Sequence, residues 1–222
     1  MEPLIPQHGG YRHLKTFQIG QLIYDVTVRF CDLYIDRRSR TRDQMVQAAR
    51  SGVQNIAEGS VASGTSRKIE LKLTNVARAS LEELRLDYED FLRQRGWELW
   101  RADHPSLKRF KAKRCSTLDE VRAWTQDELQ QAKAHGGTRK GTDKHGQART
   151  STDKKSVPVG GSPCASVPSC VLVANAALSL LNLCSHLLSR QIAAQAAAFE
   201  EEGGFTERIY RVRRNRRSTG KP

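Results

Sequence analysis

In this chain of 222 residues, arginine is the residue type whose number and spacing could form a binding site. Residues 205–222 hold seven basic residues and one carboxylate, a net charge of +6, and a second arginine cluster follows residue 36. Guanidinium groups bind phosphate oxygens, so this distribution points to the RNA or DNA backbone as partner. Such contacts read no bases, and we expect binding largely independent of sequence. The candidate nucleic-acid contacts are Arg67, Lys68, Arg208, Arg211, Arg213, Arg214, Arg216, Arg217, Arg37, Arg38, Arg40 and Arg42.

Residues for catalysis or metal binding do not assemble into a known pattern. The chain has no Glu-x-x-His pair, no His-Glu-x-x-His, no phosphate-binding loop and no Gly-x-Ser-x-Gly. Its six histidines are scattered, and Cys184 and His186, two residues apart on one predicted helix, point in different directions. We therefore predict a protein that is not an enzyme, with no catalytic residue, no metal and no cofactor.

The cysteines indicate a reducing compartment. There are five, none of them in a Cys-x-x-Cys pair, and residues 1–10 are too short and too polar for a secretory signal. We expect free thiols and a cytoplasmic protein.

Apolar residues at spacings of three and four predict the helices that position the basic groups. One helix is expected over 17–36, a second from Met45 to its C-terminal cap at Gly59, and a third, the most regular, over 66–95. A weak amphipathic helix over 118–134 follows a basic run. Residues 135–169, rich in Gly, Ser, Thr, Lys and Pro, predict a disordered linker, and 170–202 predict the last long helix.

These elements predict an all-α fold, an antiparallel up-and-down four-helix bundle with a disordered basic insert and a disordered C-terminal tail. Either 118–134 or 170–202 completes the bundle, and length and apolarity favour the latter. The expected division is helices one to three (11–100), a basic segment with a short helix (101–134), the linker (135–169), the bundle-completing helix (170–204) and the arginine-rich tail (205–222).

The last long helix is apolar enough for a membrane span to be considered. Eighteen residues from Val171 carry no charge. Its polar residues form one stripe, which suits a bundle helix with a water-facing seam, and no membrane is expected. The stripe consists of Asn175, Ser179, Asn182 and His186.

The stretch QAARSGVQNIAEGS over 47–60 combines small residues with an amide and a carboxylate. We interpret it as a helix that packs closely against its neighbours, not as a catalytic centre. A carboxylate near a helix C-terminus opposes the macrodipole, so Glu58 is expected to pair with Arg67 or Lys68 across the turn. The residues of this structural motif are Ala49, Gly52, Asn55, Glu58 and Gly59.

Two motifs in order, QAARSGVQNIAEGS and LKLTNVARASLEEL, resemble the bacterial four-helix-bundle protein family. That family includes products of open reading frames in 23S rRNA intervening sequences and the accessory variability determinant of diversity-generating retroelements. LLSRQIAAQAAAFEEEGGFTERIYR resembles the "four helix bundle suffix" extension of one branch. The resemblance implies an up-and-down bundle, assembly into a homopentamer, and binding to RNA and a reverse transcriptase.

Alternating helix directions would place the tail arginines beside Arg67 and Lys68, with the cluster after residue 36 at the opposite end. We expect phosphate contacts at the Arg67 end, where the third helix also offers free backbone donors. The predicted function is a non-catalytic nucleic-acid-binding accessory that binds RNA, and the family resemblance implies that it partners a reverse transcriptase in a diversity-generating retroelement. The alternative is an oligomeric helical scaffold that binds an acidic protein and no nucleic acid.

Overall fold

The fold of the chain is all-α, as predicted. The computed structural model describes residues 9–136 and 167–219, and within those ranges it contains helices and no strand. A short 3-10 helix covers Tyr11–His13. The α-helices are α1 (Lys15–Tyr34), α2 (Arg40–Ala62), α3 (Arg67–Arg93), α4 (Pro105–Lys113), α5 (Leu118–Gly136), α6 (Ser169–Glu202) and α7 (Phe205–Thr219).

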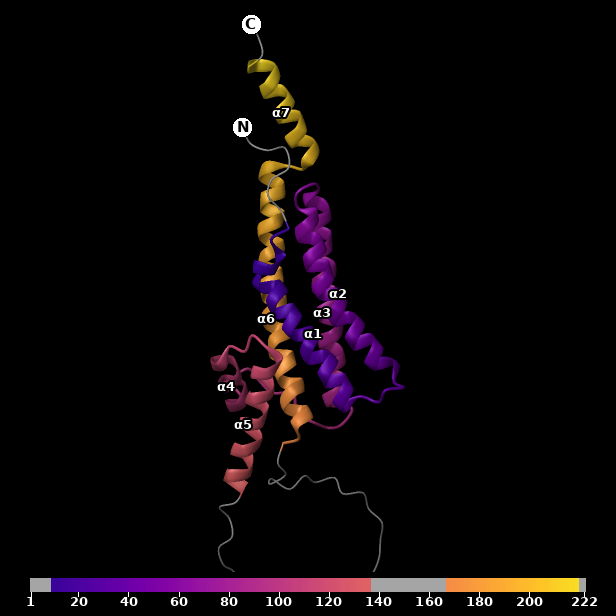
Figure 1. The fold of residues 1–222 in the computed structure, drawn as a ribbon, viewed down its shortest axis with the longest axis vertical. Helices are drawn as coiled ribbons and strands as arrows, with labels where there is room; N and C mark the ends of the chain where they lie inside the picture. Colours follow the sequence, from indigo (N-terminus) through magenta and orange to yellow (C-terminus); the bar gives the residue numbers. More distant parts are fainter. Residues whose placement is uncertain (1–8, 137–166, 220–222) are drawn as a thin grey trace, which may run out of the picture.

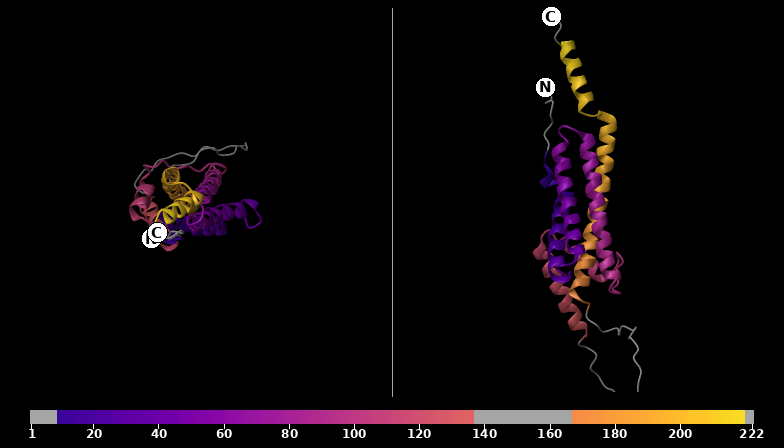
Figure 2. Two further views of the ribbon diagram at one scale, coloured as in Figure 1. Left: turned by 90° about the horizontal axis from the view of Figure 1, so that it is seen from above. Right: turned by 90° about the vertical axis from the view of Figure 1, so that its right-hand side faces the viewer.

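Four long helices lie side by side. Helix α2 packs against α1 and α3, and α6 packs against the other sides of the same two helices. Figure 1 shows α1 and α3 running one way and α2 and α6 the other. Helices α4 and α5 lie outside this group, and α7 continues beyond the end of α6 (Figures 1 and 2). Helix α6, rather than α5, therefore closes the arrangement against both α1 and α3.

The core of the four long helices is aromatic at the end where α1 meets α2. The ring of Phe30 lies 4.9 Å from that of Tyr88 and 4.8 Å from that of Phe91. Tyr88 is fully buried, and its hydroxyl donates a hydrogen bond of 3.1 Å to Thr27 Oγ1. Thr27 in turn donates to the Ile23 carbonyl at 2.7 Å. The buried polar atoms of this cluster are thus paired, as a low-dielectric core requires.

Close approach of α2 and α3 explains the small residues of 47–60. A Cβ atom at Gly52 would lie 2.6 Å from Leu81 Cδ2, so only glycine fits there without a shift. Asn55 Nδ2 donates to the Ser51 carbonyl at 2.8 Å, and Ser51 Oγ lies 3.0 Å from Ser80 Oγ on α3. The predicted close packing of this segment is confirmed.

Two details of the same segment differ from the prediction. Gly59 does not cap α2: the helix continues to Ala62, and Gly59 is buried inside it. A Cβ there would lie 3.4 Å from the Glu70 carbonyl oxygen, so this glycine admits the α3 backbone instead of ending a helix. Glu58 is exposed and forms no ion pair in the described part of the chain, so its predicted pairing with Arg67 or Lys68 is wrong.

The polar stripe of α6 is not uniformly exposed to water. Asn182 and His186 are exposed, but Asn175 is 1% exposed. Its Oδ1 accepts a 2.8 Å hydrogen bond from the Trp100 amide, and its Nδ2 donates to the Val171 carbonyl at 3.0 Å. Asn175 therefore fixes the segment after α3 onto α6, a role that periodicity alone does not indicate.

Residues 205–219 of the predicted C-terminal tail form a helix, α7, and not a disordered segment. Gly203, with φ of 71°, ends α6. Glu207, in the first turn of α7, accepts a 2.9 Å hydrogen bond from the Gly204 amide, and the arginines follow it toward the C-terminus. An acidic first turn and a basic remainder both complement the helix dipole, which favours helix over coil here. The predicted linker 135–169 lies mostly outside the described residues, and its ends belong to α5 and α6.

Candidate nucleic-acid interface

The predicted basic residues lie at two opposite ends of the molecule. The α7 end comprises Arg67, Lys68 and the arginines of α7. The α1–α2 end comprises Arg37, Arg38, Arg40 and Arg42. The turn between α2 and α3 lies at the same end as α7 (Figure 1), as the alternating helix directions predict.

Helix α7 carries the densest positive charge. Six of its fifteen residues are arginine, against one glutamate. Arg211, Arg213 and Arg214 are exposed, and Tyr210 is 71% exposed. Arg208, Arg216 and Arg217 lie on α7, but the structure describes only their backbone. The helix extends away from the long helices (Figure 2).

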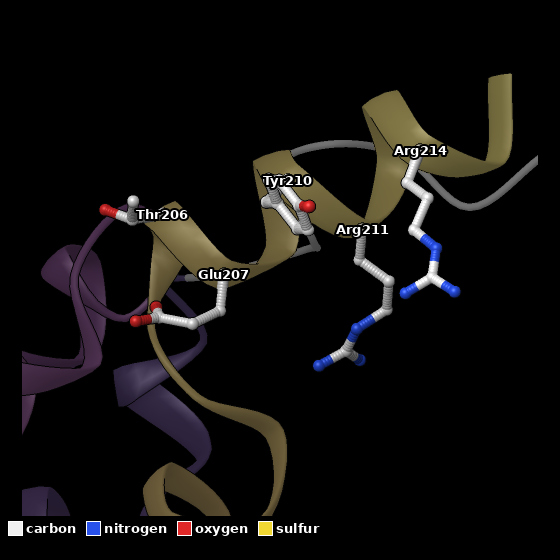
Figure 3. A pocket seen from close by; sticks show the side chains of 5 residues that line it. All are labelled: Thr206, Glu207, Tyr210, Arg211 and Arg214. Carbon is white, nitrogen blue, oxygen red and sulfur yellow. The ribbon is translucent and has the colours of Figure 1, made fainter. Parts of the chain in front are cut away.

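A shallow hollow of about 470 Å³ lies along one side of α7. It is lined by Thr206, Glu207, Tyr210, Arg211 and Arg214. Figure 3 shows the side chains of Glu207, Arg211 and Arg214 extending to the same side of the helix, with Tyr210 between Glu207 and Arg211 along the chain. Two guanidinium groups one turn apart next to an exposed phenol ring suit phosphate binding with room for an unpaired base.

Arg67 has a structural contact that the sequence does not reveal. It is half-buried, and its Nη1 donates a 2.8 Å hydrogen bond to the Ala198 carbonyl near the end of α6. Beside it, Gln195 Nε2 donates to Glu70 Oε1 at 2.9 Å, and burial raises the pKa of Glu70. Arg67 thus joins α3 to α6, whereas its neighbour Lys68 is exposed.

The α1–α2 end is less positive than its arginines suggest. Arg42 Nη2 forms a 2.6 Å ion pair with Asp32 Oδ1 across the two helices. Arg37, Arg38 and Arg40 are exposed, but Asp36 and Asp43 lie among them. Residues 32–43 hold four arginines and three aspartates, a net charge of +1, compared with +5 for α7.

An acidic strip lies on the second half of α3, toward the α1–α2 end. It consists of Glu82, Glu83, Asp87, Glu89 and Asp90, and Arg85 pairs with two of its members, Glu82 and Glu89. The hydrogen bond from Arg85 lowers the pKa of Glu82. Asp87 has its pKa raised, chiefly by burial. Glu83 lines a hollow together with Arg40 and Asp43, so the strip further offsets the positive charge of the α1–α2 end.

Reactive side chains do not gather elsewhere in the described residues. Among 9–136 and 167–219, no three His, Cys, Asp or Glu side chains lie close enough to hold a metal ion. Burial raises the pKa of Cys31 to about 11 and that of Cys184 to about 12. These two thiols are protonated at neutral pH and are poor nucleophiles.

The chain matches no family model, no curated protein and no solved structure. Helix α6 is long and apolar enough to cross a membrane by length and composition, over Ser169–Glu201, and 61% of its most apolar window is buried inside the protein. Core helices of soluble proteins pass the same test, so this is weak evidence for a span. The helical state of α7 is the main feature missed from the sequence, and the spacing of Gly204 and Glu207 is the signal that would have found it.

Proposed function

We propose that this chain is a non-catalytic nucleic-acid-binding accessory protein whose main contact surface is α7. The observation that carries the proposal is a helix of net charge +5 that extends from the long helices with Arg211, Arg213 and Arg214 exposed. Exposed guanidinium groups on a helix bind phosphates by charge and by hydrogen bonds, without reading bases.

Single-stranded RNA is the form of nucleic acid that the surface favours. Tyr210, 71% exposed beside Arg211, offers a ring on which an unpaired base can stack. Stacking of one base on an aromatic side chain contributes about 1–3 kcal/mol, and a paired base cannot use it. A duplex would be held by the arginines alone.

The arrangement of the long helices supports the rest of the proposal. We take α1, α2, α3 and α6 as an antiparallel up-and-down four-helix bundle, with α6 as its core helix in a cytoplasmic protein and not as a membrane span. By the family resemblance, the bundle assembles as a homo-oligomer, a pentamer, and presents its nucleic acid to a reverse transcriptase. Helix α7 would then appear once per subunit at one end of the assembly.

Fluorescence anisotropy across a salt series tests the proposal, with the full chain and a version ending at Gly204. With up to six arginines in contact, the log–log slope for a single strand is expected to reach about −4, and truncation should remove most of it. Weak, flat binding by both proteins would refute nucleic-acid binding. It would favour the alternative, a scaffold for an acidic protein.

Residues at the start of α3 allow a finer test. Lys68→Glu should weaken RNA binding with little change in stability, because Lys68 is exposed. Arg67→Ala should lower stability by about 1–3 kcal/mol, because it removes the donor to the Ala198 carbonyl. Unchanged affinity in Lys68→Glu would remove this position from the interface, and an unchanged unfolding free energy in Arg67→Ala would contradict the joining role.

A further inference from the structure

A large groove lies away from α7, on the side of the molecule that carries α4. It has a volume of about 1000 Å³ and is bordered by α1, α3, α4, α6 and the segment after α3. Its floor includes Leu22, Leu107, Phe110 and Leu178, each buried to 4% exposure or less. Leu99 and Leu183 at its border remain 51% and 47% exposed. Cavities of this size with a mainly apolar lining are typical of small-molecule sites.

The charged groups of the groove are predominantly cationic. Its lining contains Lys15, Arg85, Lys111 and Arg114 against a single carboxylate, Glu89. Three of the cations have protein partners. Lys15 donates to Gln18 and Lys111 to the Ala102 carbonyl, both at 3.0 Å, and Arg85 pairs with Glu82 and Glu89.

Arg114 differs from the other three cations. Within the described part of the chain its side chain has no hydrogen-bond or ion-pair partner. It occupies the C-cap of α4 with φ 50° and ψ 47°, and among the described residues it alone has a positive φ without being glycine. Glycine is the residue that suits a left-handed C-cap, and a side chain there is held at a cost in strain. Arg114 is exposed at the border of the groove, so its guanidinium is accessible to a ligand that enters there.

We propose that this groove binds a single-chain amphipathic carboxylate, with its apolar body on the leucines and Phe110 of the floor and its carboxylate on Arg114. Guanidinium matches carboxylate in charge and can hold it with two parallel hydrogen bonds. The excess of three positive charges in the lining disfavours a cationic ligand. The exposed Leu99 and Leu183 give an alkyl chain apolar surface to cover. The inference is independent of nucleic-acid binding by α7.

Isothermal titration of the full chain with decanoate, below its micelle concentration, tests the inference. Decyltrimethylammonium, with the same chain and the opposite charge, and acetate, with the charge and no chain, are the matched ligands. Saturable binding is expected for decanoate alone. Equal binding of the cationic ligand, or no binding of decanoate, would overturn the proposal.

Three variants locate the site. Arg114→Gly keeps the left-handed backbone and removes the cation, so we expect a roughly tenfold or larger rise in the decanoate Kd with an unfolding temperature no lower than that of the natural chain. Arg114→Lys, which keeps the charge, should stay closer to the natural affinity. Leu183→Gln, at the exposed border, should weaken decanoate binding as well.

Two results would assign Arg114 a different role. A lower unfolding temperature in Arg114→Gly, with decanoate affinity unchanged, would make it structural. A change of oligomeric state in Arg114→Gly, measured by light scattering, with no decanoate binding in either protein, would make the groove a contact between copies of the chain. Both results overturn the ligand proposal, and neither bears on α7.

Discussion

Neutralising the exposed arginines of α7 is the sharpest test of the proposed nucleic-acid interface. The perturbation is a triple change of Arg211, Arg213 and Arg214 to alanine. All three side chains are exposed, and alanine keeps the helix. The matched control removes the same three charges from the other end, with alanine at Arg37, Arg38 and Arg40, which are also exposed. Both variants have the same net charge, so a difference between them reports position and not total charge.

The expected magnitude follows from the number of phosphate contacts removed. Three contacts account for about 2.1 units of log–log salt slope on a single strand and about 2.7 on a duplex. Between 50 and 200 mM salt, the natural chain should therefore lose roughly 20-fold more affinity for single-stranded RNA than the α7 triple variant. The α1–α2 control should change the slope by less than the contribution of about one phosphate contact, because Asp36 and Asp43 already offset its arginines.

Fluorescence anisotropy with a labelled single strand and the matched duplex measures both slopes. Circular dichroism checks that each variant keeps its helices, since exposed substitutions are expected to change stability by about 0.5 kcal/mol or less. Equal slope changes in the two variants would show that net charge, and not the geometry of α7, governs binding. An unchanged slope in the α7 variant would refute α7 as the interface.

Two predictions concern the fold that supports these sites. Gly52→Val should lower the unfolding free energy by about 1–3 kcal/mol in chemical denaturation, because its Cβ would lie 2.6 Å from the buried Leu81; an unchanged midpoint would refute the close packing. Glu128, whose side chain is 5% exposed, accepts two 2.6 Å hydrogen bonds from Arg109, and these lower its pKa. Glu128→Gln should therefore lower the free energy of unfolding by about 1.5–3 kcal/mol at neutral pH. The pKa of Glu128 in the folded protein lies below its ordinary value of 4.5. The natural chain should therefore keep its larger free energy of unfolding, relative to Glu128→Gln, above that pH. This difference in unfolding free energy should shrink as the pH falls through the folded pKa. If the difference in unfolding free energy stayed constant down to pH 3, the stabilising role of the Arg109–Glu128 pair would be contradicted.

The helices were largely predictable because helix formation depends on local spacing. Helix α3 spans Arg67–Arg93, against a predicted 66–95, with Ser66 as its N-cap. The faces were predicted less well. Leu33, Ile69 and Val76 fit the apolar stripes of their helices, yet they are 51%, 50% and 39% exposed. A stripe marks the side that can be buried, and the neighbours that pack on it decide how much of it is covered.

The basic residues of the candidate interface were predictable from the sequence, but their secondary structure and tertiary contacts were not. The arginines of 205–222 were evident as charge, whereas their placement on a helix depended on the cap formed by Gly204 and Glu207. The contact between Arg67 and the Ala198 carbonyl joins residues 131 positions apart, and no local pattern encodes it. The groove that Arg114 lines draws on four helices and the segment after α3, so it exists only once they pack.

The sequence by itself determined that this protein is helical, that its charge is concentrated in particular segments, and that α2 needs small residues. Those properties follow from residue type and from a spacing of three and four positions, both of which are local. The tertiary structure alone decided that Asn175 is buried, that Arg67 donates a hydrogen bond to α6, and that the exposed Arg114 borders a groove with an apolar floor and has no protein partner in the described part of the chain. These outcomes depend on which surfaces meet when distant helices pack, because burial and pairing are properties of the neighbours and not of the residue.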